Sequence, residues 1–337
     1  MLQAARQARP DLCESRNGER WMPSRRVTWM GYGACALAGG LWGTGFYFGR
    51  LALNEMSVEW MVLYRFLFAS LGMLPIALLH RVRLTRSEVW ILLISAAFGI
   101  PIQFLLQFHG LALTTVSHAS LMVGSMPVLL AVAAAMFAGE RLDWIGWAAL
   151  TGSTIGVALI VLGGSRGPAT RGEPSLAGDL LVVASLVIAL AWILLNKKLM
   201  LTHSPTVVTS YSILAGTLML ACISLGPWMV HPLFRSHALE SVPFAGVSST
   251  AWIALAISGL LCTATTTLLW NWGIHHVPAS RAGVFLNIEP ALGSLLGVRL
   301  LGEHLGPFAW VGGGMILGAA VILTTRGHQT EPEIILE

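Results

Sequence analysis

An uncharged stretch in the first half of the chain limits the possible folds most strongly. From Val89 to Gly139, 51 consecutive residues contain no Asp, Glu, Lys or Arg. One straight helix of that length would reach about 77 Å, whereas a membrane-spanning helix needs only about 20 residues. The polar residues Thr114, Thr115 and Ser117 interrupt the stretch. It therefore predicts two membrane-spanning helices joined near Thr114.

Similar stretches recur along the rest of the chain. Of the 337 residues, 55% are hydrophobic and only 11% are charged, whereas soluble domains carry about 25% charged residues. So few charged side chains cannot cover a water-exposed surface, and the main solvent must be lipid. Eight further stretches can each cross a membrane once: 27–49, 58–79, 144–164, 179–196, 206–230, 250–272, 279–301 and 307–325. We therefore predict an all-α polytopic membrane protein with ten transmembrane helices.

The basic residues predict the orientation of these helices. With the N-terminus inside, 14 Lys and Arg residues lie at the inner ends and 5 at the outer ends, and inner loops of membrane proteins are enriched in these residues. The first apolar stretch is longer than the core of a cleaved signal peptide, so it is read as a transmembrane helix. We expect a multi-pass protein of the cell's inner (cytoplasmic) membrane, with both termini cytoplasmic.

The two halves of the chain repeat each other. Residues 110–142 align without a gap on 273–305, an offset of 163, and the matches include glycine, proline and glutamate: Gly110/Gly273, Pro127/Pro290 and Glu140/Glu303. Five spans per half would insert the second half in the opposite sense, as in many secondary transporters. The expected organisation is a cytoplasmic tail (1–26), repeat 1 (27–164), a linker (165–178), repeat 2 (179–326) and a second tail (327–337).

Several classes of protein are disfavoured by missing motifs. The sequence pI is about 9.1, but no basic patch with interleaved aromatic residues suggests nucleic-acid binding. The four cysteines show no C-x-x-C spacing, and the adjacent pair His275-His276 has no acidic partner nearby in sequence, so no metal site is predicted. H-E-x-x-H, G-x-S-x-G and P-loop signatures are also missing. We expect no enzyme activity, catalytic residue or cofactor.

Short motifs give the chain a family resemblance. They are Leu41-Trp42-Gly43-Thr44, Tyr64-Arg65-Phe66-Leu67, Ser117-His118-Ala119-Ser120, Met126-Pro127, Gly139-Glu140-Arg141-Leu142, Glu289-Pro290 and Gly302-Glu303-His304-Leu305. Together they resemble the drug/metabolite transporter superfamily in its ten-helix form with two EamA-type repeats. The resemblance covers residues 27–326. It implies a metabolite carrier with a central cavity, and it does not identify the substrate.

Three functions remain open on these grounds. The favoured one is a secondary transporter that exports amino acids or related small metabolites, with protons as a candidate coupling ion. A second is an importer or exchanger of a carboxylate, nucleobase or vitamin, and a third is a membrane-embedded sensor or assembly factor without transport. The expected partners are a small-molecule substrate and the lipid bilayer, and the protein could be a monomer or a homodimer.

Arg65 and Glu289 are the main candidates for binding substrate, because charges within a membrane face protein or water. Arg65 would hold a carboxylate, and Glu289 would meet an ammonium group or carry the coupling proton. A structural ion pair between them is the alternative. Further candidates for the substrate site are polar or aromatic residues within the spans, each of which could instead serve packing: Trp42, Gln107, His118, Asn271 and Asn287.

Other residues are expected to be structural. Glu140 and Glu303 follow apolar stretches and are predicted to cap or bound helices. The pairs Gly152/Gly156 and Gly314/Gly318 have the small-x-x-x-small spacing of helix contacts. The helices that contain them, at 144–164 and 307–325, are expected to pack together beside the bundle that encloses the cavity.

Overall fold

The computed structural model describes most of the chain between residues 25 and 326. The described residues are 25–80, 82–126, 128–129, 132, 144–163, 174–230, 246–276 and 283–326. Both predicted tails, except 25–26, therefore lie outside the described residues. The same holds for Pro127, for Glu140, for most of the linker and for residues 231–245.

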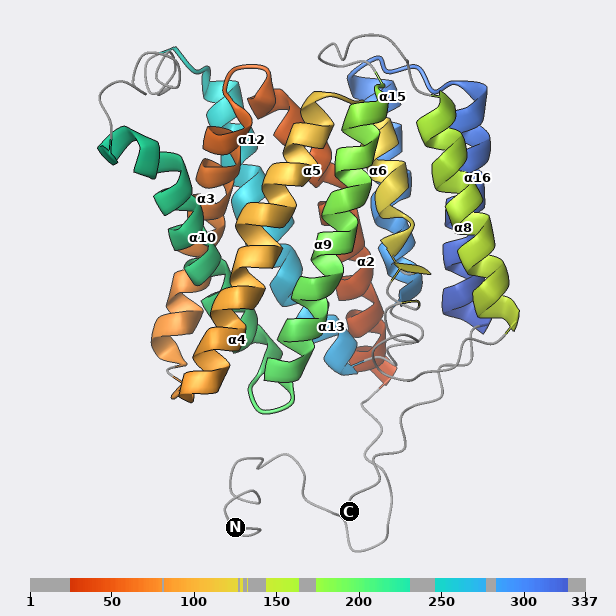
Figure 1. The fold of residues 1–337 in the computed structure, drawn as a ribbon. Helices are drawn as coiled ribbons and strands as arrows, with labels where there is room; N and C mark the ends of the chain where they lie inside the picture. The colour runs from red at the N-terminus through yellow and green to blue at the C-terminus, as the bar shows by residue number, and fades with distance from the viewer. Residues whose placement is uncertain are drawn as a thin grey trace, which may run out of the picture.

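Helices account for the regular structure of the described residues, and they run side by side in a bundle (Figure 1). The first half contains α2 (Arg25–Leu53), α3 (Val58–Leu79), α4 (Arg86–Ala97), the π-helical turn η1 (Phe98–Ile102), α5 (Gln103–Ala112), α6 (Val116–Val123) and α8 (Trp144–Gly163). The second half contains α9 (Leu176–Met200), α10 (Pro205–Val230), α12 (Ser249–Gly259), the π-helical turn η2 (Leu260–Thr265), α13 (Thr266–His276), the 3₁₀ turn η3 (Gly283–Asn287), α15 (Ile288–Leu300) and α16 (Pro307–Arg326).

Among the residues that the structure describes, five helices are long and apolar enough to cross a membrane. By length and composition these are Val58–Leu79, Arg86–Ala112, Leu176–Met200, Pro205–Ser224 and Ser249–Gly273, and shorter apolar helices cover Trp144–Ile160 and Pro307–Ile322. Large apolar side chains such as Leu71, Leu78 and Phe308 are exposed on the outside of the bundle. An all-helical, multi-pass membrane fold accounts for this outer surface, because lipid can cover it.

The long uncharged stretch breaks where the sequence predicts. α5 ends at Ala112 and α6 begins at Val116. Thr115 is the N-cap of α6, and its side-chain oxygen accepts a hydrogen bond of 3.1 Å from the backbone N–H of His118. A threonine in this position satisfies one of the donors that a helix start leaves without a partner.

Two of the described transmembrane segments contain a π-helical turn. In the first, η1 joins α4 to α5 and contains Pro101, which has no N–H to continue the ladder of helix hydrogen bonds. In the second, η2 joins α12 to α13, and the hydroxyls of Thr263 and Thr266 donate to carbonyl oxygens five residues earlier, at 3.0 Å and 2.6 Å. Such turns locally widen a helix and often occur at functional sites.

Helices α8 and α16 pack against each other at one side of the bundle, as the sequence predicts (Figure 1). The glycines that permit the contact are not the predicted pairs. A Cβ added at Gly156 would lie 2.6 Å from the Gly312 carbonyl oxygen, whereas Gly314 and Gly318 have nothing within 4 Å and Gly152 meets only Ala319, at 3.9 Å. The prediction is therefore wrong for Gly314 and Gly318, which face none of the described residues, whereas Gly152 faces α16 at an ordinary van der Waals distance.

Candidate functional site

Arg65 lies inside the bundle, on α3. The residue is 6% exposed, and its Nε donates a hydrogen bond of 3.2 Å to the Thr263 hydroxyl in η2. The guanidinium carbon lies 5.3 Å from the ring centre of Phe104 and 5.2 Å from that of Phe108, both on α5. Aromatic faces attract cations at these distances, which offsets part of the cost of burying the charge.

The outer nitrogens of Arg65 have no acceptor among the described residues. Its one hydrogen bond to a described residue uses Nε, so the N–H groups of Nη1 and Nη2 are not used by this part of the protein. The backbone of α2 runs beside them, because a Cβ at Gly45 would lie 3.5 Å from Nη2. Cys262 is also close to Arg65, and its sulfur lies 3.1 Å from the hydroxyl oxygen of Thr44. The guanidinium therefore presents a fork of donors that suits a planar anion.

Glu289 is partly buried near the start of α15. The described ion pairs are His109–Glu59, His118–Asp179 and His203–Glu88, so Arg65 and Glu289 interact electrostatically without a direct salt bridge. Glycines let α15 pack closely on its neighbours α6 and α2. A Cβ at Gly293 would collide with Ser120 of α6, and one at Gly43 on α2 would lie 2.8 Å from the Glu289 carbonyl oxygen.

The remaining sequence candidates lie in several different places. Trp42 packs against Trp270 with 5.5 Å between ring centres, and Gln107 is 7% exposed on α5. Asn271 is partly buried on α13, and its side-chain nitrogen has no hydrogen-bond partner in the described part of the chain. Asn287 ends η3, whereas His118 is at one end of the bundle beside Asp179.

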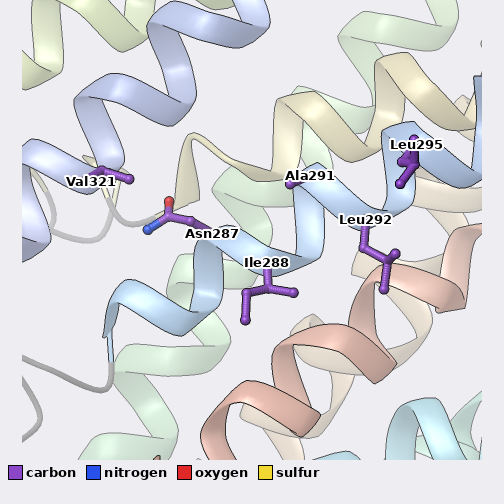
Figure 2. A pocket seen from close by; sticks show the side chains of 6 residues that line it. All are labelled: Asn287, Ile288, Ala291, Leu292, Leu295 and Val321. Atoms are coloured by element: carbon purple, nitrogen blue, oxygen red, sulfur yellow. The ribbon is translucent and has the colours of Figure 1, made fainter.

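A hollow of about 390 Å³ lies beside α15 and α16. Figure 2 shows the lining side chains of α15 projecting in different directions, with Asn287 at the end of η3 and Val321 on α16. Five of the six lining residues are apolar, and Asn287 is the polar one. This hollow does not include Arg65 or Glu289, and its chemistry does not suit a polar metabolite.

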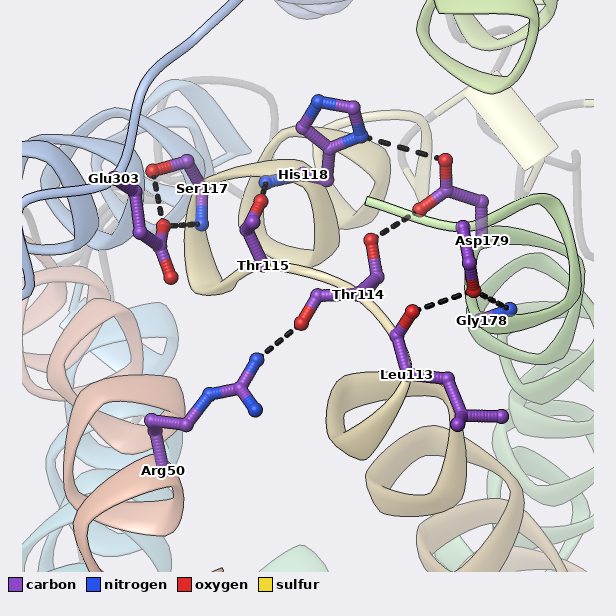
Figure 3. A network of polar contacts seen from close by, with 10 residues as sticks. Arg50, Leu113, Thr114, Thr115, Ser117, His118, Gly178, Asp179 and Glu303 are labelled. Carbon is purple, nitrogen blue, oxygen red and sulfur yellow. Dashed lines mark hydrogen bonds and ion pairs between the residues drawn. The ribbon is translucent and has the colours of Figure 1, made fainter. Parts of the chain in front are cut away.

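A polar network joins the two halves at one end of the bundle (Figure 3). Arg50 of α2 donates to the Thr114 carbonyl oxygen, and the Thr114 hydroxyl donates to Asp179 Oδ1 at 2.5 Å. His118 Nδ1 lies 3.3 Å from Asp179 Oδ2. Asp179 is the first residue of a predicted span, and an acidic residue so close to an apolar run is a usable signal of such a contact.

Glu303 caps α6 from the opposite half of the chain. Its carboxylate accepts hydrogen bonds from the backbone N–H groups of Val116 and Ser117, at 2.7 Å and 2.8 Å, and from the Ser117 hydroxyl at 2.6 Å. A carboxylate at a helix N-terminus satisfies free donors and interacts favourably with the helix dipole. The predicted capping role of Glu303 is confirmed.

Two further carboxylates tie segments of different halves together. Glu55 accepts hydrogen bonds of 2.6 Å from both the backbone N–H and the hydroxyl of Ser248, which precedes α12. These bonds hold the pKa of Glu55 below its usual range. Glu88, near the start of α4, accepts from the Thr202 hydroxyl at 3.1 Å and lies 3.0 Å from His203 Nε2. In each tie, a connection between two helices of one half contacts the start of a helix in the other half.

A buried arginine fork inside a bundle of apolar helices is typical of integral membrane proteins that handle polar solutes. Two separate parts of the chain, residues 29–162 and 176–325, match the EamA-like transporter family. The chain belongs to this family, within the drug/metabolite transporter superfamily, and is a membrane transporter rather than an enzyme.

Relatives with curated names agree with this class. The chain is 25% identical over 286 residues to a protein of Streptantibioticus cattleyicolor named "Probable terminal-alkyne amino-acid exporter", covering 85% of this chain and 90% of that protein. It is also 25% identical to the inner membrane protein YtfF of Escherichia coli, covering 88% and 95%. A solved crystal structure with 20% identity and a TM-score of 0.57 covers 89% of this chain and 96% of its own, and shows the same fold.

Proposed function

We propose that the protein is a secondary carrier that exports amino acids or related small metabolites across the cytoplasmic membrane. Its ten spans form two inverted repeats, at 27–164 and 179–326, and both termini are cytoplasmic. Arg65 supplies the main recognition of substrate. The arrangement around its guanidinium is the observation that carries the proposal.

The internal symmetry of the bundle supports two inverted repeats. The offset of 163 that aligns 110–142 with 273–305 also places η1, at 98–102, on 261–265 within η2. Helix contacts recur in matching pairs. The contact between α5 and α9 corresponds to the contact between α13 and α2. The contacts between α3 and α10 and between α6 and α15 each join two equivalent helices of the two halves. The Glu55–Ser248 and Glu88–Thr202 contacts also correspond to each other. In each, the connection between the first two helices of one half contacts the start of the third helix of the other half. A twofold axis in the membrane plane accounts for these matches.

Arg65 supports recognition of a carboxylate. Phe104 and Phe108 hold the guanidinium in place, and Thr263 accepts from Nε alone. Since Nη1 and Nη2 keep their donors, a substrate carboxylate can accept two parallel hydrogen bonds from this fork. The relative from Streptantibioticus cattleyicolor, named as an amino-acid exporter, agrees with a carboxylate-bearing substrate.

Glu289 and the smaller candidates complete the proposed site. Glu289 interacts electrostatically with Arg65, so one substrate can meet a cation on one side and an anion on the other. Amino acids carry both charges at neutral pH. Trp42 offers an aromatic surface, while Gln107, Asn271 and Asn287 offer amide groups, and we propose that these residues contact the remainder of the substrate.

The function can be tested with purified protein in liposomes. We expect liposomes that contain an unlabelled mixture of the protein amino acids to take up a radiolabelled mixture by exchange, and protein-free liposomes to take up none. Exchange of carboxylates or nucleobases without amino acids would support the second function instead. Absence of exchange with all three mixtures would contradict a carrier and favour a sensor or assembly factor.

The topology predicts the results of reporter fusions. A fusion after Gly172 should place alkaline phosphatase outside the cell and make it active. Fusions after Thr202 or Arg326 should remain inside, where a fluorescent protein folds and alkaline phosphatase does not. An active phosphatase after Arg326 would place the C-terminus outside and contradict both the ten-span count and the inverted repeat.

A further inference from the structure

Two buried polar groups between α5 and α9 have no use in the site proposed above. The indole Nε1 of Trp192 on α9 is a donor, and the amide Oε1 of Gln103 on α5 is an acceptor. Both atoms are buried, and neither has a hydrogen-bond partner among the described residues. Gln103 as a whole is 8% exposed. Buried polar groups without a partner are rare in native proteins, because each one costs free energy unless water or a ligand satisfies it.

One face of the helix formed by α4, η1 and α5 packs on α9 (Figure 1). Ser95, Gly99 and Gln103 follow one another at intervals of four residues, and in a regular α-helix this spacing drifts by about 40° per step. The wider π-helical turn η1 lies between Ser95 and Gln103 and offsets this drift. Ser95 donates a hydrogen bond of 2.7 Å to Asn196 Oδ1 on α9, and Gly99 contacts Trp192. Gln103 therefore lies on the face that contacts α9.

Glycine at position 99 makes room for the Trp192 indole. A Cβ there would lie 2.2 Å from Trp192 Cδ1 and 2.6 Å from Trp192 Nε1, so no other residue fits without moving the ring. Gln103 lies four residues further along the helix, a rise of about 6 Å at most. The Trp192 donor and the Gln103 acceptor can therefore both reach one small polar group between α5 and α9.

The pair of Trp192 and Gln103 lies next to the Arg65 site. Gln103 directly precedes Phe104, whose ring centre lies 5.3 Å from the guanidinium carbon of Arg65. Neighbouring helical residues point about 100° apart, so α5 turns a phenylalanine toward Arg65 and a glutamine toward α9. A small molecule whose carboxylate is bound by Arg65 can thus extend another group toward Gln103.

The internal symmetry of the bundle supports a role for Trp192 in substrate binding. Trp42 of α2 contacts α13 through Trp270, and Trp192 of α9 contacts η1 through Gly99. The contact of α2 with α13 corresponds to that of α9 with α5. Trp192 is therefore the counterpart of Trp42, which is proposed above to contact substrate, and inverted repeats bind substrate at the interface between them.

One donor and one acceptor without charge select a particular side chain. A primary carboxamide satisfies both, since its carbonyl oxygen accepts from Trp192 Nε1 and its NH2 group donates to Gln103 Oε1. A carboxylate cannot donate and an ammonium group cannot accept, and each would have its charge buried. An aliphatic side chain leaves both protein groups without a partner, and a site built to form hydrogen bonds rejects such a ligand.

We propose that Trp192 and Gln103 form a subsite for the side-chain carboxamide of the transported amino acid, so that glutamine and asparagine are the preferred substrates. This inference rests on the proposed carrier function and specifies its substrate class. Both protein atoms are covered in this structure, so the carboxamide binds when α5 and α9 separate, as the alternating access of a carrier requires. It displaces no hydrogen bond within the described part of the protein, because neither atom has one there.

Exchange of single amino acids in liposomes tests this subsite. Liposomes that contain the protein and an unlabelled amino-acid mixture are supplied with radiolabelled glutamine, glutamate or methionine, at equal concentrations below saturation. These three substrates have side chains of similar length. We expect glutamine to exchange about tenfold faster than either of the others, which corresponds to the gain from about two neutral hydrogen bonds.

Two variants each remove one of the proposed hydrogen bonds. Trp192→Phe keeps an aromatic ring beside Gly99 but lacks the N–H donor, and Gln103→Met keeps the chain length but lacks the acceptor. Each should lower the ratio of glutamine to methionine exchange about threefold to tenfold. Methionine uses neither hydrogen bond, so its own exchange should fall far less. The matched control Trp90→Phe changes a tryptophan that is 59% exposed on α4, and should keep the ratio of the unmodified protein.

The proposal is overturned if the unmodified protein exchanges glutamine no faster than methionine, or if either folded variant keeps its ratio. A ratio lowered equally by Trp90→Phe would also overturn it. If Trp192→Phe does not fold, Gln103→Met decides, and loss of folded protein in both would show that the two residues serve packing alone. Methionine exchange without a preference for glutamine would remove only the subsite, whereas exchange of none of the three would contradict the carrier function itself.

Discussion

Replacing Arg65 with lysine is expected to lower amino-acid exchange about 10- to 100-fold while leaving the amount of folded protein close to normal. Lysine keeps the positive charge but loses the planar fork, and a charged hydrogen bond contributes about 1.5–3 kcal/mol. A difference of about 1.4 kcal/mol corresponds to a factor of ten. Lysine also lacks the planar guanidinium that lies over the rings of Phe104 and Phe108. Initial exchange rates in liposomes, compared at equal protein content, measure the effect.

The matched control is Arg299→Lys, because Arg299 is an exposed arginine at the end of α15, and its exchange rate should be normal. Glu289→Gln should also lower exchange if Glu289 meets the substrate ammonium as proposed, because glutamine carries no negative charge. Normal exchange by both Arg65→Lys and Glu289→Gln would reject the proposed site. If both variants instead misfold and the double replacement Arg65→Met with Glu289→Met restores stability, the two residues serve the structure rather than the substrate.

Gly156→Leu or Gly312→Leu is expected to remove most of the folded protein from the membrane. A Cβ at Gly156 would lie 2.6 Å from the Gly312 carbonyl oxygen, and one at Gly312 would lie 2.5 Å from the Gly156 carbonyl oxygen. Backbone atoms cannot move aside as a flexible side chain can, so α8 and α16 would have to separate. Overpacking of this kind costs about 1–3 kcal/mol or more. Detergent size-exclusion profiles with a fluorescent fusion measure the folded fraction.

Gly314→Leu and Gly318→Leu are the matched controls, since each adds the same side chain to α16 where nothing lies within 4 Å. Their profiles should resemble that of the unmodified protein. Equal losses in all four variants would mean that α16 tolerates no added bulk anywhere, and would contradict a specific Gly156–Gly312 contact. Normal folding with altered selectivity in the Gly156 or Gly312 variant would instead place these helices at the substrate site.

Some details of the site were predictable because they depend on local chemistry. The break at Thr114–Thr115 follows from polar residues inside an uncharged stretch, and the Thr115 cap occurs there. Glu303 was predictable as a cap because it follows an apolar helix, although its target, α6 in the other half, was not. The burial of Arg65 follows from the cost of exposing a charge to lipid.

Other details depend on how each helix is rotated about its axis. The spacing of glycines identifies faces that can pack closely, but Gly156 and Gly312 form the contact and Gly314 does not. The same limit applies to Asp179 and His118, which are 61 residues apart in sequence and interact only because α9 lies beside α6. A membrane helix is apolar on its lipid-facing side and on its protein-facing side. Its sequence therefore does not specify which side faces the inside of the bundle, and so does not specify its rotation about its axis.

The sequence by itself determined the solvent, the helical class and the family of this protein, because lipid excludes unpaired backbone groups and charged surfaces. It also placed an arginine and a glutamate inside the membrane. Only the tertiary structure decided that Phe104, Phe108 and Thr263 hold the Arg65 guanidinium, and that Asp179 meets His118. These contacts join residues from separate helices, and they depend on the packing of side chains between neighbouring helices rather than on any local pattern.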